Sequence, residues 1–221
     1  GGLGAVKCDV VHPATAKHIA KYAKHEVRVF RETGDVYRRV TLPYIEREEL
    51  GGRIEWVHNI LDKKKESERI LLEDADAKDG FILLPDMKWD QKSTSELYCL
   101  AIANRRDLPT LRSLTPEHLP LLRNVLSKGY QLLETRFGVR SHHVRAYLHY
   151  QPTFYHLHVH FTHVDMEGPS MEAGKAHLVQ DVIDNIEAKG DYYQSVPLSM
   201  VLRTSLGLWK ELESAGCVNA D

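Results

Sequence analysis

The segment Tyr155–Phe161 limits the possible folds more than any other part of this 221-residue chain. Three imidazoles alternate there with three large apolar side chains. Strict alternation is typical of a half-buried β-strand, because successive side chains of a strand point to opposite faces. The imidazoles that we expect on one face belong to His156, His158 and His160, and the apolar side chains that we expect in the core belong to Leu157, Val159 and Phe161.

The imidazole face has three competing interpretations. Ordinary exposed polar residues are the first, but strand propensity gives no reason for three histidines in register. A metal site is the second, because neutral imidazole is a common ligand. Alternate residues of a strand lie about 6.6 Å apart, so we expect at most two of the three to share an ion. The third, which we favour, is a phosphate-handling site with His158 as nucleophile, because neutral imidazole has a free lone pair near its pKa of about 6.5.

Composition and charge narrow the class of protein. With 43% hydrophobic residues, the chain can form one or two globular domains. The formal net charge of -2 argues against the polybasic surface that binds long nucleic acid, whereas a short nucleotide stays possible. No apolar run approaches the roughly 20 residues of a membrane span. Cys8, Cys99 and Cys217 form no Cys-x-x-Cys pair, so we expect a soluble protein in a reducing, intracellular compartment.

Periodicity and turn residues predict an α+β fold, in which helices pack on one face of an antiparallel sheet. Apolar positions at helical spacing predict helices over residues 15–33, 54–61, 93–101, 115–137, 176–189 and 205–212. Short apolar or alternating runs predict strands over residues 69–72, 81–84, 144–149, 155–161 and 196–202. The short loop after His149 should return the chain antiparallel, which brings His149 near the three imidazoles.

A few side chains outside the imidazole strand have a chemistry suited to a ligand. Trp56 lies off the apolar stripe of its helix, and an indole ring is the best aromatic surface for stacking on a cationic base. Lys21 is expected on a solvated helix face, although it could reach a phosphate. A metal-dependent hydrolase is an alternative class, with Asp165 or Glu167 completing a site beside the histidines.

The run from His156 to Phe161 resembles the histidine triad motif, His-x-His-x-His followed by apolar residues, of nucleotide hydrolases and transferases. Thr162 departs from the apolar residue that the motif has at its seventh position. Within that superfamily, the chain resembles the scavenger mRNA decapping enzymes over almost its whole length. The resemblance is carried by residues 13–15, 31–35, 56–64, 85–89, 114–124 and 147–150, which lead into the triad.

The resemblance implies a histidine-triad-like (HIT) antiparallel sheet preceded by a helical remnant of an N-terminal domain. Residues 1–24 would be the end of that dimerisation and lid domain with its hinge, and residues 25–221 the catalytic domain. The chain starts at Gly1 without a Met, and we expect it to be truncated. The family is homodimeric, so a homodimer is expected. Its members also imply a location in the cytoplasm and nucleus.

The resemblance further implies a hydrolase acting on acid anhydrides that needs no metal and no cofactor. Such an enzyme cleaves 7-methylguanosine (m7G) cap dinucleotides or short capped oligonucleotides, releasing m7GMP and a nucleoside diphosphate through a covalent histidine nucleophile. Long nucleic acid and membranes are not expected partners. Two alternatives stay open: a cap-binding module without catalysis, in which His158 has no role as nucleophile, and a different HIT nucleotide hydrolase.

By the same resemblance, His158 is the nucleophile, His156 and His160 orient it and contact phosphates, and His149 lies beside the phosphate chain. Trp56 would stack on the methylated base and Met87 would oppose it. The polar edge of the base would meet Glu66 and the carbonyl of Pro85. Asp86 would reach the ribose and Lys88 a phosphate. Thr153 and Phe154 occupy a phosphate-contacting loop where Ser-Tyr is the expected pair.

Overall fold

The computed structural model describes residues 10–15, 19, 25–87 and 89–218. A six-stranded antiparallel sheet with strand order β2-β3-β4-β6-β5-β7 forms its centre, and β1 pairs with β8 in a separate two-stranded sheet. The strands are β1 (Val27–Glu32), β2 (Leu72–Glu73), β3 (Phe81–Pro85), β4 (Tyr98–Ala103), β5 (Val144–His149), β6 (His158–His163), β7 (Ala176–Leu178) and β8 (Leu198–Arg203).

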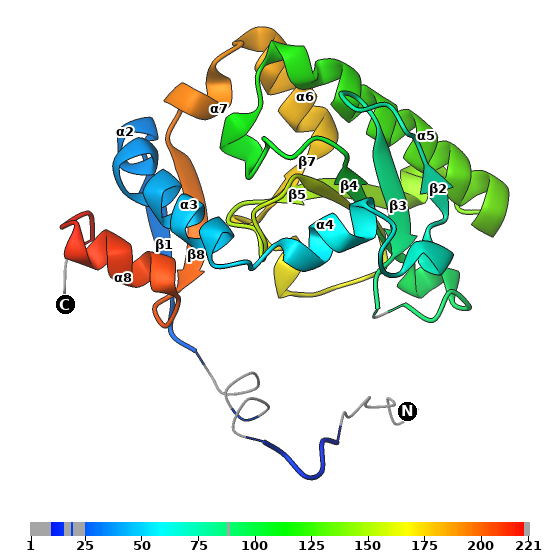
Figure 1. Cartoon of the computed structure of the whole chain (residues 1–221), viewed down its shortest axis with the longest axis horizontal. Helices are drawn as coiled ribbons and strands as arrows, with labels where there is room; N and C mark the ends of the chain where they lie inside the picture. Colours follow the sequence, from blue (N-terminus) through cyan, green and yellow to red (C-terminus); the bar gives the residue numbers. More distant parts are fainter. Residues whose placement is uncertain (1–9, 16–18, 20–24, 88, 219–221) are drawn as a thin grey trace, which may run out of the picture.

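Helices cover both faces of the central sheet. In Figure 1, α5 and α6 lie along one side of it, α4 crosses the other side, and α2, α3 and α8 accompany the β1–β8 pair. The helices are α2 (Gly34–Val36), α3 (Leu42–Leu50), α4 (Glu55–Leu61), α5 (Leu119–Phe137), α6 (Val179–Ala188), α7 (Tyr192–Ser195) and α8 (Gly207–Ser214), and a π-helical turn, Tyr37–Thr41, joins α2 to α3. Short 3₁₀ turns occupy Ser67–Arg69, Thr94–Glu96, Leu111–Ser113, Pro116–His118, Ser141–His143 and Pro169–Met171.

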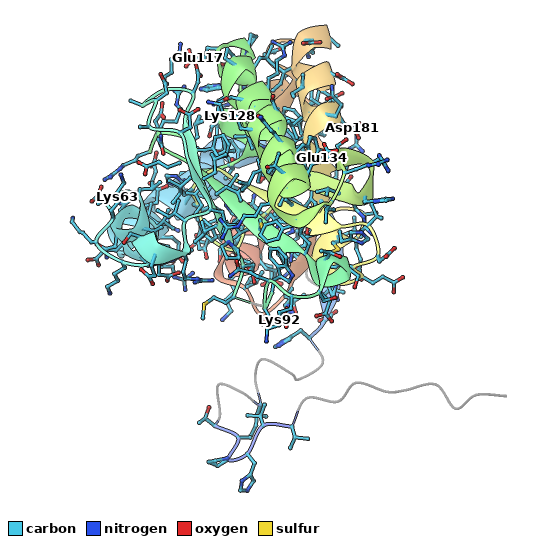
Figure 2. The ribbon with its side chains drawn as sticks, turned by 90° about the vertical axis from the view of Figure 1, so that its right-hand side faces the viewer. Lys63, Lys92, Glu117, Lys128, Glu134 and Asp181 are labelled. Atoms are coloured by element: carbon cyan, nitrogen blue, oxygen red, sulfur yellow. The ribbon has the colours of Figure 1, made fainter. Side chains whose placement is uncertain are left out.

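The larger core lies between the sheet and α5, which packs directly on the triad strand. A Cβ on Gly129 of α5 would lie 2.5 Å from Cζ of Phe161, so only glycine allows this approach. The opposite face of α5 carries charge, and Figure 2 shows Lys128 and Glu134 on the outside of the helix. Its C-terminus is capped by Gly138 with φ of 69°.

In the part of the chain that is described, no helix is long and apolar enough to cross a membrane.

The predicted α+β fold with an antiparallel sheet is confirmed. The expectation that helices pack on one face of the sheet is wrong, because α4 packs on the face opposite α5 and α6. The predicted helices at 54–61, 115–137 and 205–212 and the predicted strands at 81–84, 144–149 and 196–202 are present within a few residues of their expected ends. The triad strand begins at His158 instead of Tyr155, α6 begins at Val179 instead of Ala176, and the strand expected at 69–72 is reduced to β2.

Two predicted helices are wrong where strands take their place. Residues 98–101 belong to β4, which lies between β3 and β6 in the middle of the sheet. Such a strand is buried on both faces, and its continuous apolar run cannot be told from a helix by periodicity. Residues 27–32 form β1, because pairing with β8 satisfies their backbone groups. Residues 16–18 and 20–24 of that predicted helix, including Lys21, lie outside the described residues.

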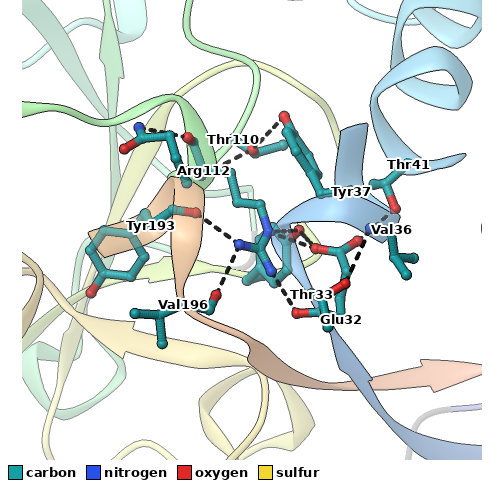
Figure 3. A network of polar contacts seen from close by, with 11 residues as sticks. Glu32, Thr33, Val36, Tyr37, Thr41, Thr110, Arg112, Tyr193 and Val196 are labelled. Carbon is teal, nitrogen blue, oxygen red and sulfur yellow. Dashed lines mark hydrogen bonds and ion pairs between the residues drawn. The ribbon is translucent and has the colours of Figure 1, made fainter. Parts of the chain in front are cut away.

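A buried ion pair joins the β1–β8 unit to the central domain. The Arg112 and Glu32 side chains are fully buried, and Nε of Arg112 donates to Oε2 of Glu32 over 2.6 Å. Figure 3 shows the guanidinium group between Glu32 and the backbone carbonyls of Tyr193 and Val196, to which it also donates. The hydroxyl of Tyr150 donates to the same carboxylate. An ion pair in which both charged groups are fully buried is stable only when hydrogen bonds replace the lost water to this extent.

We expect Arg112→Leu to lower the free energy of unfolding by at least about 3 kcal/mol, because Glu32 is then left charged and buried without its partner. Denaturant unfolding of both proteins measures the difference. Arg39→Ala is the matched control, because Arg39 forms its ion pair with Asp35 on the surface. The control should leave the unfolding midpoint unchanged, and an equal effect of both substitutions would contradict the role of the buried pair.

Candidate active site

The imidazole face of β6 is the face that α4 covers. In the sheet register, His158 lies opposite Ile102 and His160 opposite Leu100. Both partners point toward the smaller core, in which Val57 and Ile60 of α4 pack against β3 and β4. Paired residues of neighbouring strands share a face, so the triad histidines lie beside α4. The triad strand is therefore buried on both faces instead of one: His156, His158 and His160 are 2%, 3% and 5% exposed.

His149 lies close to two of the triad histidines, His158 and His160. It ends β5, which pairs with β6, and its ring centroid lies 4.1 Å from that of His160. The rings of His158 and His160 are 4.9 Å apart, and Tyr147 stacks on His160 at 5.1 Å. One ring nitrogen each from His149, His158 and His160 lies within 4.8 Å of the other two. The predicted proximity of His149 to the triad is confirmed.

Hydrogen bonds to backbone carbonyls determine the tautomers of two histidines. Nδ1 of His158 donates to the carbonyl of His156 over 2.7 Å, and Nε2 of His156 donates to the carbonyl of Ala103 over 2.8 Å. Burial lowers the pKa of His158 to about 3, and burial also lowers the pKa of His156. At neutral pH the His158 ring is therefore uncharged, and its lone pair lies on Nε2. This atom is buried and has no hydrogen-bond partner within the described part of the chain.

The ring of Phe154 contacts both Trp56 and His158. Its ring stacks on the imidazole of His158, with centroids 3.9 Å apart and planes 15° apart. The same ring makes a T-shaped contact with Trp56, with centroids 4.9 Å apart and planes 74° apart. Trp56 projects from α4 with 43% of its surface exposed, which leaves part of the indole open to a stacking partner. The expected base-stacking residue and the expected nucleophile thus both contact the ring of Phe154.

Glu66 and Pro85 are held together by Arg69, a residue that the sequence analysis did not single out. Nη1 of Arg69 donates to the Glu66 carboxylate, and Nη2 donates to the carbonyl of Pro85 over 2.9 Å. Glu66 adopts the left-handed conformation with φ of 56°, which costs about 1 kcal/mol outside glycine. The spacing of Glu66 and Arg69, three residues apart and opposite in charge, was the available signal.

The remaining predicted binding residues that the structure describes are Asp86, Met87 and Thr153. Asp86 follows β3, and its backbone N–H donates to the carbonyl of Tyr98 over 2.9 Å. The side chain of Met87 is 85% exposed and Thr153 is also exposed. Lys21 and Lys88 lie outside the described residues.

A cavity of about 330 Å³ opens beside the loop that carries Thr153. Gln151, Thr153 and Tyr155 contribute to its wall. Its cationic lining residues are Arg53, Lys175 and Arg203. A cavity of this kind is suited to a small anionic group.

The acidic residues of the metal-dependent alternative do not join the histidine cluster. The carboxylate of Asp165 lies 3.4 Å from Nδ1 of His163 and is 70% exposed. His163 belongs to a separate group of rings, 5.8 Å from His143. Among the described residues, the group close enough to share an ion is His149, His158 and His160, without Asp165 or Glu167.

The chain is similar to known proteins over most of its length. A family model described as "Scavenger mRNA decapping enzyme C-term binding" matches residues 55–176. The m7GpppX diphosphatase of Homo sapiens is 48% identical over 213 residues, which cover 96% of this chain and 63% of the relative. That of Ascaris suum is 43% identical over 198 residues (90% and 65%), and that of Schizosaccharomyces pombe is 39% identical over 198 residues (89% and 65%). The chain thus spans a little under two thirds of the length of these relatives.

The buried neutral His158 should make the protein less stable in acid. Its pKa is about 3 when folded and about 6.5 when unfolded, so between these values the unfolded chain binds a proton that the folded chain does not. Stability therefore falls as pH falls through this window, by about 1.4 kcal/mol per pH unit. In His158→Asn the slope between pH 4 and 6 should be shallower by about that amount.

Guanidinium unfolding at several pH values measures this slope. His142→Asn is the control, because the side chain of His142 is exposed, and it should keep the wild-type slope. Parallel slopes for wild type and His158→Asn would contradict the burial of a neutral imidazole.

Proposed function

The chain belongs to the scavenger mRNA decapping enzyme family, and on this basis we propose that it hydrolyses the triphosphate bridge of short m7G-capped fragments and cap dinucleotides. The products are m7GMP and a nucleoside diphosphate. The observation that carries the proposal is the lone pair of His158 Nε2, held beside His149 and His160 by a backbone hydrogen bond at Nδ1. We also propose a homodimer in the cytoplasm and nucleus, on the family relationship alone.

The proposed reaction has two steps. Nε2 of His158 attacks the phosphorus that carries 7-methylguanosine, a P–N bond forms, and the P–O bond to the next phosphate breaks to release the nucleoside diphosphate. The imidazole becomes cationic, and its Nδ1–H bond to the His156 carbonyl strengthens because the donor is now charged. Water then attacks the same phosphorus, releases m7GMP and restores the neutral ring. The bonds formed and broken in these two steps balance without a metal ion or a cofactor.

Access to the nucleophile depends on the 151–154 loop. Phe154 stacks on His158, and Nε2 of that histidine is buried. A phosphate therefore reaches Nε2 only after Phe154 moves away from the imidazole. The same movement separates Phe154 from Trp56 and leaves more of the indole free to contact the methylated base. The cationic cavity beside Thr153 is suited to the second nucleotide.

Recognition of the base divides into two contributions. Methylation at N7 makes guanine a delocalised cation, and stacking of that cation on Trp56 contributes roughly 2 kcal/mol when desolvated. The N1–H and N2–H groups of guanine are donors, and Glu66 and the Pro85 carbonyl are acceptors. Arg69 is a positioning residue for this edge, because it fixes both acceptors in one arrangement and leaves each a further lone pair.

We expect His158→Asn to keep cap binding and to lower the hydrolysis rate by far more than tenfold, because asparagine is polar and similar in size but has no attacking lone pair. Hydrolysis is followed by chromatography of the products of a cap dinucleotide. Quenching without acid during turnover should recover label from the m7G-linked phosphate on wild-type protein. His142→Asn, on the exposed side, is the control for rate. A rate above about a tenth of wild type, only about 1.4 kcal/mol in barrier, would exclude His158 as nucleophile.

Trp56→Ala and Arg69→Ala should alter base recognition in different ways. Trp56→Ala should remove most of the roughly thirtyfold preference for the methylated cap, which corresponds to about 2 kcal/mol of stacking. Arg69→Ala should weaken methylated and unmethylated caps alike, by about tenfold, because both share the N1–N2 edge. Calorimetry with both ligands measures the affinities, and Arg136→Ala is the exposed arginine control.

Thermal melts of both variants separate loss of the site from loss of the fold. Methyl preference that survives Trp56→Ala in a folded protein would remove Trp56 from the site. Preserved affinity in Arg69→Ala would remove the positioning role.

A further inference from the structure

The ring nitrogens of His149, His158 and His160 are grouped like the ligands of a metal site, but they lie further apart than bound ligands do. Their ligand nitrogens lie within 4.8 Å of one another, and all three side chains are buried. Three nitrogens bound tetrahedrally to Zn²⁺ at about 2.0–2.1 Å lie roughly 3.3 Å apart. Closing that difference takes a change of about 1.5 Å at most, which is within the range of small side-chain rotations. The supporting strands β5 and β6 are paired neighbours in the sheet, which holds the three side chains near one another.

The surrounding hydrogen bonds orient two of these ligands. Nδ1 of His158 donates to the carbonyl of His156, which leaves Nε2 as the lone-pair nitrogen. Nδ1 of His160 lies 3.0 Å from the hydroxyl of Tyr98. Metal-binding histidines almost always have such a partner on the second ring nitrogen, because it fixes the tautomer and the ring orientation. Nε2 of His158 is also a buried nitrogen with no hydrogen-bond partner among the residues that the structure describes.

We propose that His149, His158 and His160 bind a divalent transition-metal ion, with Zn²⁺ as the best match, and that the bound ion blocks the nucleophile. Strand spacing limits the triad itself to two ligands. The third comes from the neighbouring strand. His156 stays outside the set, because its Nε2–H is directed at the carbonyl of Ala103. Three neutral imidazoles leave one coordination position for water or a phosphate oxygen.

The blocking effect rests on the proposed function, whereas the metal site does not. An ion on Nε2 of His158 uses the lone pair that the proposed reaction needs, so the metal-bound protein cannot form the P–N bond. The ion would therefore be an inhibitor and not a cofactor.

The metal site is tested with Co²⁺ alone, added to metal-stripped wild-type protein. We expect one equivalent to bind with the intense visible absorption of four-coordinate cobalt, and Zn²⁺ to displace it. His149→Gln and His160→Gln should each weaken binding by at least about tenfold, since even outer-shell changes have effects of that size. His163→Gln is the matched control, because His163 is on the same strand but groups with His143.

A second measurement uses wild-type protein and does not depend on the folding of any variant. Long-range ¹H–¹⁵N spectra of the imidazoles should show three histidines shifted by one equivalent of Zn²⁺. Weak six-coordinate cobalt spectra, shifts at other histidines, or unchanged affinity in folded His149→Gln and His160→Gln would each overturn the site.

The blocking effect is read separately, from cap hydrolysis with and without Zn²⁺. Inhibition that a chelator reverses is the expected result. Binding at the three histidines without inhibition would overturn the blocking effect. A protein that hydrolyses no cap would contradict the proposed function alone, because the cobalt and imidazole spectra need no substrate.

Discussion

The pairing of Arg112 with Glu32 is the interaction on which the arrangement of the two sheets depends. Burying either charge alone is strongly unfavourable, so both must enter the core together with enough hydrogen bonds to replace water. Oε1 of Glu32 accepts from the Thr41 hydroxyl over 2.5 Å, and the Arg112 guanidinium reaches backbone carbonyls of the segment before β8. These partners come from segments far apart in the chain. The pair therefore fixes the β1–β8 unit against the central domain in one position (Figure 3).

That constraint continues into the site through Tyr150. Its hydroxyl bonds to Glu32 and it directly precedes the loop that ends at the triad strand. With Tyr150 anchored at one end and β6 at the other, the short loop must cross the imidazole face, and Phe154 covers His158. The cover removes water from the histidines, and loss of hydration is the main cause of the low pKa of His158. The neutral state of the nucleophile thus depends on packing that begins at a distant ion pair.

The sequence predicted those parts of the site that local patterns encode. Alternation in β6 placed the histidines on one face, and the short return loop placed His149 beside them. Burial of that face was not predicted, because α4 and Phe154 cover it through tertiary contacts that strand periodicity does not report. Strand β4 was mistaken for a helix for the same reason, since its neighbours on both sides, and not its own pattern, make it a strand. The bridge from Arg69 to Pro85 was missed because its ends are 16 residues apart.

The neutral state of His158 changes where the charge for phosphate binding must come from. An uncharged imidazole offers one donor and one lone pair, but it does not offset the negative charge of a triphosphate. Described cations next to the loop, Arg53, Lys175 and Arg203, line the adjacent cavity instead of the reacting centre. This separation has a physical advantage: a cation in contact with His158 would make the cationic imidazole of the intermediate less stable, whereas a cation several ångströms away still attracts the substrate. A nucleophile and a metal ligand both need an uncharged ring nitrogen with a free lone pair. A reacting centre built from histidines, with its cations in the adjacent cavity, therefore has the side chains of a metal site as well.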